Sequence, residues 1–166
     1  MKADGKDDVK AALTVDGYQR LTALIESAWQ ELQAGDAGRR DHCLEVVSDV
    51  LETGHLTQDD AERAVARLVP VALSDEGHTV RESALHAIFT GSTRYRFPYR
   101  VVEPLADGVD RFERVLLGYV LGILCDTYDQ AALPIIERFL DHPHPEVRKE
   151  AAEAAGELRA AGRGPE

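Results

Sequence analysis

The residues that could do metal chemistry stand closest together in the stretch DHPHP, which contains Asp141, His142 and His144. Carboxylate and imidazole groups are ordinary ligands of transition metals. A turn between two helices needs the same residue types, because an aspartate suits the turn and a polar residue before Pro145 caps the next helix. The sequence therefore favours a structural turn at this point, and we expect no metal site.

The other reactive groups are scattered along the chain. His78 and His86 are expected to be surface or cap residues. Cys43 and Cys125 are the only cysteines, and each occurs in a helix-like pattern, so we expect buried thiols rather than a disulfide. We find no phosphate-binding loop, nucleophile elbow, Cys-x-x-Cys pair or His-Glu-x-x-His motif. The prediction is a protein without catalysis, metal or cofactor.

The chain of 166 residues is strongly acidic, with 30 Asp and Glu against 19 Lys and Arg and a formal net charge of -11. This charge repels nucleic acid and anionic membranes, so neither is expected as a partner. The longest apolar run, Val115 to Cys125, is shorter than the ~20 residues that cross a bilayer, and no secretory segment opens the chain. We expect a soluble, cytoplasmic protein of one domain.

Apolar residues recur at helical spacing almost throughout the chain, whereas the alternation typical of strands is absent. The prediction is an all-α domain of eight helices in residues 16–162, between a flexible segment, 1–15, and a tail, 163–166. Gly35 and Gly54 predict the ends of the first two helices. The expected starts or caps of the later helices are Thr57, Thr79, Pro98, Asp110, Thr127 and His144.

Two stretches repeat one pattern, LVPVALSDEGHTVRESALHAI and ALPIIERFLDHPHPEVRKEAAEAAGEL. Each has a proline within its first helix, an aspartate at the turn and a Val-Arg pair opening its second helix. Between them, Pro104, Asp107 and Arg114 take corresponding positions. Arg81, Arg114 and Arg148 are 33 and 34 residues apart, about one helix pair per step. This periodicity favours stacked helix pairs, with an irregular helical bundle as the alternative.

The proline, turn aspartate, Val-Arg pair and small residue at these offsets resemble the HEAT-repeat family, most strongly from Ala64 to Leu158. The resemblance implies a right-handed α-solenoid of about four antiparallel helix pairs. The first pair fits loosely, which suggests a terminal capping pair. In that family the turn aspartate and the arginine of the second helix link neighbouring repeats. The residues at these positions are Asp75, Arg81, Asp107, Arg114, Asp141 and Arg148.

The second helix of the third pair is apolar on every side, from Val115 to Cys125. A helix that is apolar all round must be covered all round, and a two-layer stack covers only part of it. Two interpretations are open. In one, the ends of the neighbouring helices fold over this helix. In the other, a partner protein covers it, and Leu116, Tyr119 and Ile123 anchor the interface.

The stretch STRYRFPYR, residues 92–100, is a basic and aromatic island, because no acidic residue occurs from Ser83 to Val102. Arginine and tyrosine concentrate binding energy in interfaces, so one interpretation is a loop that binds an acidic partner or a phosphate. The other is a linker, in which the aromatic rings tuck under the helices and each arginine meets a local acid such as Glu103 or Asp107. The candidate binding residues are Arg94, Tyr95, Arg96, Tyr99 and Arg100.

The expected architecture and charge predict a non-catalytic module that binds another protein. Small acidic helical proteins of this kind resemble immunity or antagonist proteins that neutralise a basic toxin or nuclease. Glu150, Glu153 and Glu157 of the last helix would then form an acidic rim that steers a cationic partner. The alternatives are an adaptor or assembly scaffold, and a HEAT-like enzyme of base-excision or lyase type acting in the concave groove. HEAT-like glycosylases imply a basic groove, which these acids argue against.

Overall fold

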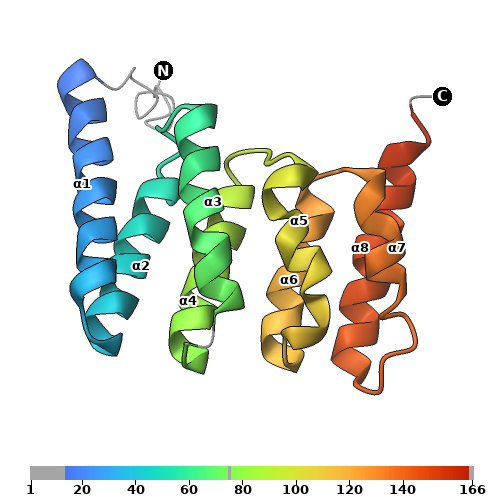
Figure 1. Cartoon of the computed structure of the whole chain (residues 1–166). Helices are drawn as coiled ribbons and strands as arrows, with labels where there is room; N and C mark the ends of the chain where they lie inside the picture. The colour runs from blue at the N-terminus through green and yellow to red at the C-terminus, as the bar shows by residue number, and fades with distance from the viewer. Residues whose placement is uncertain (1–13, 75, 165–166) are drawn as a thin grey trace, which may run out of the picture.

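The structure, a computed structural model, describes residues 14–74 and 76–164. In these two ranges the chain forms eight α-helices, two short 3-10 helices and no strand, which confirms the all-α prediction (Figure 1). Of the segment predicted to be flexible, only Thr14 and Val15 are described, and they cap and begin α1. The elements are α1 (Val15–Ala34), α2 (Ala37–Glu52), α3 (Gln58–Leu73), α4 (His78–Ser92), α5 (Tyr99–Asp107), η2 (Val109–Arg111), α6 (Arg114–Asp126), η3 (Gln130–Ala132), α7 (Leu133–Glu137) and α8 (Pro145–Gly162).

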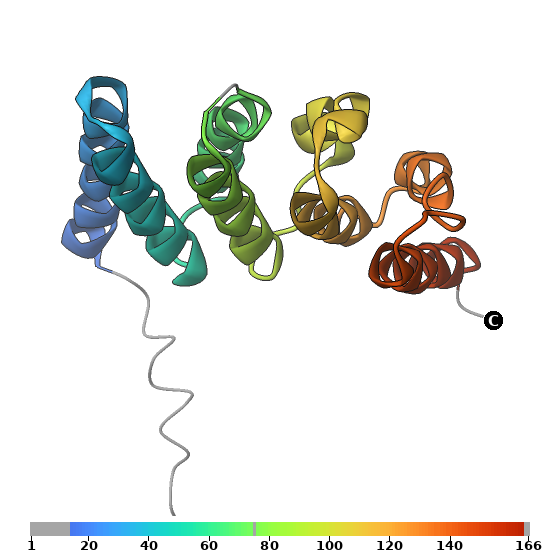
Figure 2. The same ribbon diagram turned by 90° about the horizontal axis from the view of Figure 1, so that it is seen from below.

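The helices lie in two layers along a row. Each odd-numbered helix packs against the helix that follows it, and the even-numbered helices also pack on one another in chain order, α2 on α4, α4 on α6 and α6 on α8. Figures 1 and 2 show the result, with α1 at one end of the row and α8 at the other. We call the two layers the odd layer and the even layer. The outer side of each layer forms one long surface of the molecule.

A single apolar core fills the space between the layers, from Ile25 in α1 to Leu158 in α8. Twelve large side chains of this core are almost completely enclosed, and they come from α2, α3, α4, α5, α6, α7 and α8. Burial of this kind contributes about 1.5 to 3 kcal/mol for each large apolar side chain. Of the described helices, none is long and apolar enough to cross a membrane.

Several predicted helix boundaries are confirmed. The hydroxyl of Thr57 caps α3 by accepting a hydrogen bond from the backbone N–H of Asp60, at 3.1 Å. His144 is the residue before α8, and Pro145 takes the first helical position. Gly35 ends α1. The Thr57 hydroxyl satisfies a backbone donor that the helix start leaves without a partner, whereas His144 makes no side-chain cap hydrogen bond.

Three predicted boundaries are wrong. Thr79 lies inside α4, because that helix already begins at His78. Asp110 belongs to the short helix η2 and does not cap α6, whose preceding residue is Glu113. Thr127 ends α6 rather than starting the next helix, since its hydroxyl donates to the carbonyl of Leu124 at 2.7 Å. In each case the residue type also suits a turn, and the neighbouring backbone decides which role it takes.

The predicted links between turn aspartates and arginines are not formed in the described part of the chain. Arg81 instead donates to the carbonyls of Ala72, at 3.1 Å, and Arg111, at 3.3 Å, and so ties α4 to the loop before α6. Arg148 donates to the carbonyls of His142 and Pro143 in its own turn. Asp75 lies outside the described residues. Neither Asp107 nor Asp141 forms an ion pair with Arg114 or Arg148. Among the described residues, carbonyl oxygens accept the side-chain hydrogen bonds of Arg81 and Arg148.

Candidate interaction surface

The apolar helix α6 is covered by its own chain. It packs between α4 and α8 in the even layer and against α5 and α7 of the odd layer. Leu116 and Ile123 are only 0% and 1% exposed, so the prediction that they anchor a partner is wrong. Val115 is 53% exposed and Tyr119 is partly exposed. The part of α6 that is exposed to solvent is therefore smaller than its all-round apolar composition suggested.

Tyr119 is the member of the predicted anchor that reaches the surface. Its ring makes edge-to-face contacts with His86, at 6.2 Å between centroids, and with Phe89, at 6.1 Å. Burial raises the pKa of Tyr119, and the nearby Glu82 carboxylate raises it further. Such ring contacts hold the tyrosine in place at the junction of α4 and α6.

Half of the arginine loop acts as a linker. The Tyr95 hydroxyl accepts a hydrogen bond from the backbone N–H of Leu56 at 2.9 Å, and Phe97 is buried. Arg100 forms an ion pair with Glu62 of α3 at 3.2 Å, rather than with the expected Glu103 or Asp107. These contacts fasten the connection between α4 and α5 to the second helix pair.

The other half of the loop remains on the surface. Arg94 and Arg96 are exposed, and neither forms an ion pair with a carboxylate of the described residues. The Arg96 guanidinium lies over the ring of Tyr128 at 4.5 Å, a cation–π contact between exposed groups. Tyr99, at the start of α5, is partly buried, and burial is the main cause of its raised pKa. The stretch therefore has two parts. Arg94 and Arg96 are exposed basic side chains, whereas Tyr95, Phe97 and Arg100 hold the loop against neighbouring helices.

The acids predicted on the last helix line a cavity of about 230 Å³ between α6 and α8. Gly118 and Gly122 of α6 form part of its floor, and Asp126 adds a further carboxylate from α6. The acids of α8 in this cavity are Glu150, Glu153 and Glu157.

Asp126 is the acid of this cavity that burial affects most. Burial raises its pKa, the hydrogen bond that the Ser92 hydroxyl donates at 2.6 Å lowers it, and the nearby Glu157 raises it again. Burial and Glu157 also raise the pKa of the Cys125 thiol, to about 12. Cys125 is therefore a protonated, structural thiol at neutral pH.

A second acidic cavity, of about 430 Å³, lies farther along the even layer between α2 and α4, with Tyr119 at its edge. Its carboxylates are Glu45, Asp49 and Glu82. No lysine or arginine of the described residues lines either cavity. We call the carboxylates that line these two cavities the acidic face. Its members are Glu45, Asp49, Glu82, Asp126, Glu150, Glu153 and Glu157.

Sequence reasoning missed Glu45, Asp49 and Asp126 of the acidic face. The first two are four residues apart on α2, a spacing that places them on one side of a helix. That signal was available, but it could not show that α2 lies in the same layer as α8. Only the packing of α2 on α4 and of α6 on α8 brings these acids onto one face.

The DHPHP turn has a structural explanation. The backbone N–H of His144 donates to Nδ1 of His142 at 3.2 Å, and the two imidazole rings lie 5.4 Å apart. The described residues contain no cluster of three or more histidine, cysteine or acidic side chains that could hold a metal ion.

No family model matches the chain, and no curated protein matches it. Among solved structures, it resembles the crystal structure of an engineered protein from the Northeast Structural Genomics Consortium. The similarity has a TM-score of 0.58 at 15% sequence identity and covers 93% of this chain and 67% of the engineered protein. At this identity the likeness concerns the fold alone.

Proposed function

We propose that this protein is a non-catalytic binding module that holds a basic partner protein on its acidic face. We further propose that its helix pairs form a right-handed α-solenoid of the HEAT-like kind, with about four repeats. The packing of the even-numbered helices in chain order supports this second proposal. In such a fold the second helix of each pair lines one shared surface, which is the place where partners bind.

The observation that carries the proposal is the set of carboxylates that line the two cavities of the even layer, among which Glu153 also lies 3.9 Å from Lys149 of its own helix. Three carboxylates line the cavity between α2 and α4, and four line the cavity between α6 and α8, without a lysine or arginine among the lining residues. Like charges held on one face raise the local negative potential and attract cationic groups over several ångströms. Such a face accelerates the encounter with a basic protein and disfavours acidic partners.

An aromatic contact point lies within this face. Tyr119, Phe89 and His86 form a cluster of ring contacts between α4 and α6, with acids on both sides. Aromatic side chains at the centre of an interface contribute more binding energy than rim charges do. The cluster would therefore supply affinity, while the acids supply orientation and rate of association.

Two biological roles fit a module of this kind. As an immunity or antagonist protein, it would neutralise a basic toxin or nuclease by covering its cationic active surface. As an adaptor, it would hold a basic subunit within a larger assembly. The enzyme alternative is a base-excision or lyase activity in the concave groove. Its base-excision form would need a cationic groove for a nucleic-acid substrate, and the acids of the even layer disfavour that form.

Affinity capture from the native organism, followed by mass spectrometry, tests the proposal. The bait variant Glu153→Gln/Glu157→Gln removes two charges of the acidic face. Its matched control, Glu103→Gln/Asp107→Asn, removes two exposed charges at the same spacing on α5 of the odd layer. We expect wild type and control to retain a basic protein that the first variant loses as salt is raised. Equal retention by all three baits would refute the acidic face as the binding site.

A further inference from the structure

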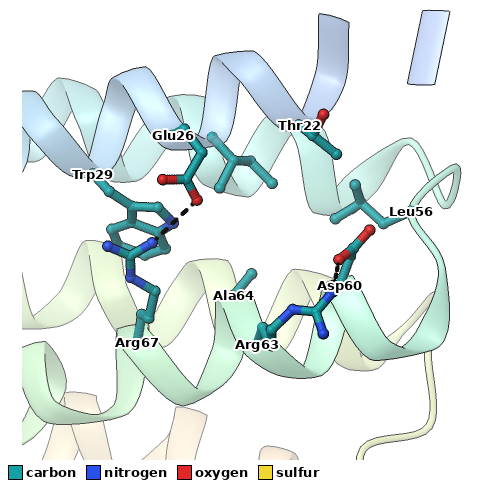
Figure 3. A pocket seen from close by; sticks show the side chains of 9 residues that line it. Thr22, Glu26, Trp29, Leu56, Asp60, Arg63, Ala64 and Arg67 are labelled. Carbon is teal, nitrogen blue, oxygen red and sulfur yellow. Dashed lines mark hydrogen bonds and ion pairs between the residues drawn. The ribbon is translucent and has the colours of Figure 1, made fainter. Parts of the chain in front are cut away.

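A separate cavity lies on the odd layer, between α1 and α3. Two side-chain bridges span the gap between these helices. The hydroxyls of Tyr18 and Thr57 are hydrogen-bonded at 3.3 Å, and Arg67 forms an ion pair with Glu26 at 3.3 Å. Between the bridges is a cavity of about 150 Å³ (Figure 3). It shares no lining residue with the acidic face.

The floor of this cavity is apolar. It consists of buried side chains from both helices and from the connection before α3, namely Ile25, Trp29, Leu56 and Ala64. An apolar cavity of about this volume accommodates a group the size of a benzene ring. The floor therefore suits a branched aliphatic or small aromatic side chain and not a larger ring system.

The rim of the cavity carries charges of both signs. Figure 3 shows Arg67 reaching from α3 to Glu26 on α1, while Arg63 turns back to Asp60 on its own helix. Arg67 also stacks on the Trp29 ring at 4.8 Å, which fixes its position. The Arg63 side chain is 72% exposed and, among the residues that the structure describes, pairs with Asp60 three positions earlier, so it can turn toward a ligand.

The two guanidinium groups and two carboxylates leave the rim neutral overall. A ligand with a single charge would take one partner from an existing ion pair and leave the opposite charge to water, because most of these side chains are well exposed. A ligand that carries one positive and one negative group can join both pairs without leaving a charge unmatched. Charge complementarity and the apolar floor together select a zwitterion with a short apolar body.

We propose that this cavity binds a free α-amino acid with a branched aliphatic side chain, of which leucine is the test case. The side chain lies on the apolar floor. The carboxylate accepts hydrogen bonds from Arg63 at one end of the cavity, and the ammonium group donates to the rim carboxylate Glu26 at the other (Figure 3). The Thr22 hydroxyl already donates to backbone carbonyls of α1 at 3.0 and 3.3 Å, so toward the ligand it can only accept, from the ammonium group. Ligand binding would add a third bridge between α1 and α3.

The fluorescence of Trp29 can report ligand binding directly, because Trp29 is the one tryptophan of the chain and lines the cavity. Its fluorescence and isothermal titration calorimetry should both show saturable binding of L-leucine to the full chain. We expect 4-methylpentanoate, which lacks the ammonium group, and 3-methylbutylamine, which lacks the carboxylate, to bind at least about 10-fold more weakly. Equal binding of either analogue, or no leucine binding by both methods, would overturn the proposal.

Two variants and one control test whether leucine binds in this cavity. Ala64→Leu fills the cavity and should abolish the response to leucine, whereas Ala23→Leu, at an exposed position of α1, should leave it unchanged. Arg63→Gln changes an exposed side chain that the fold does not need, and it should weaken leucine binding at least about 10-fold. If Arg63→Gln binds leucine like wild type, the site is wrong, whatever Ala64→Leu does to stability.

Discussion

Gly118 provides a test in which stability and binding should change in opposite directions. Glycine in a helix interior is less favourable than alanine by about 1 kcal/mol. A Cβ atom at position 118 would meet a carboxylate oxygen of Glu150 at 2.7 Å. That oxygen is the end of an exposed, flexible side chain, which can move away. We therefore predict that Gly118→Ala raises the free energy of unfolding by about 0.5 to 1 kcal/mol.

Gly122, one turn along the same helix, is the matched comparison. A Cβ atom there would meet the ring of Phe89 at 2.9 Å, and that ring packs against Tyr119. Because an aromatic ring cannot fold away as a carboxylate can, the clash offsets the gain in helix propensity. Gly122→Ala should therefore be neutral or destabilising.

Urea unfolding followed by far-ultraviolet circular dichroism at pH 7 measures both variants. Thermal unfolding should show Gly118→Ala melting about 1 to 4 °C above wild type, given the shift expected for a chain of this size. The same methyl group displaces Glu150 and partly fills the cavity between α6 and α8, so partner binding should weaken. If Gly118→Ala destabilises the protein as much as Gly122→Ala, the carboxylate of Glu150 is not free to move, and the reasoning fails.

Three further predictions concern burial and charge. Leu116→Ala should lower the free energy of unfolding by about 2 to 5 kcal/mol in urea titrations, whereas Val115→Ala should change it by less than about 0.5 kcal/mol. Because burial raises the folded-state pKa of Asp126, its ionisation opposes folding, and stability falls as pH rises through that pKa. Asp126→Asn should therefore be more stable than wild type at pH 7, and this advantage should be lost as pH falls through the raised pKa to about 4, the pKa of an aspartate in the unfolded chain; an equal difference at pH 7 and pH 4 contradicts this. Cys125, whose pKa is raised to about 12, should resist a thiol reagent at pH 8 until urea unfolds the chain, and rapid labelling of the folded protein would show otherwise.

The sequence predicted the helices better than their junctions. Helical spacing and simple caps such as Thr57 and His144 depend on residues close in the chain, so they can be recognised locally. The junctions around Asp110 and Thr127 contain 3-10 turns, whose residue types also suit helix starts. Which role they take depends on packing against distant helices, and a local pattern does not contain that information.

The acidic face could be predicted only in part, because local sequence patterns show which residues share a helix face but not how distant helices pack. The acids of α8 stand in one helix, and their shared face follows from the spacing of Glu150, Glu153 and Glu157. Whether α6 was exposed depended on how closely α4 and α8 approach it, and the structure shows Leu116 and Ile123 enclosed. The cavity between α1 and α3 combines residues up to 45 positions apart, from Thr22 to Arg67, and no motif marks it.

We propose that the acidic face binds a basic protein. The most direct test is the association rate of the captured partner with immobilised wild type, Glu153→Gln/Glu157→Gln and the control Glu103→Gln/Asp107→Asn, measured at low and high salt by surface plasmon resonance. We expect slower association and a weaker salt dependence for the first variant alone. Equal rates and equal salt dependence for all three proteins would contradict it.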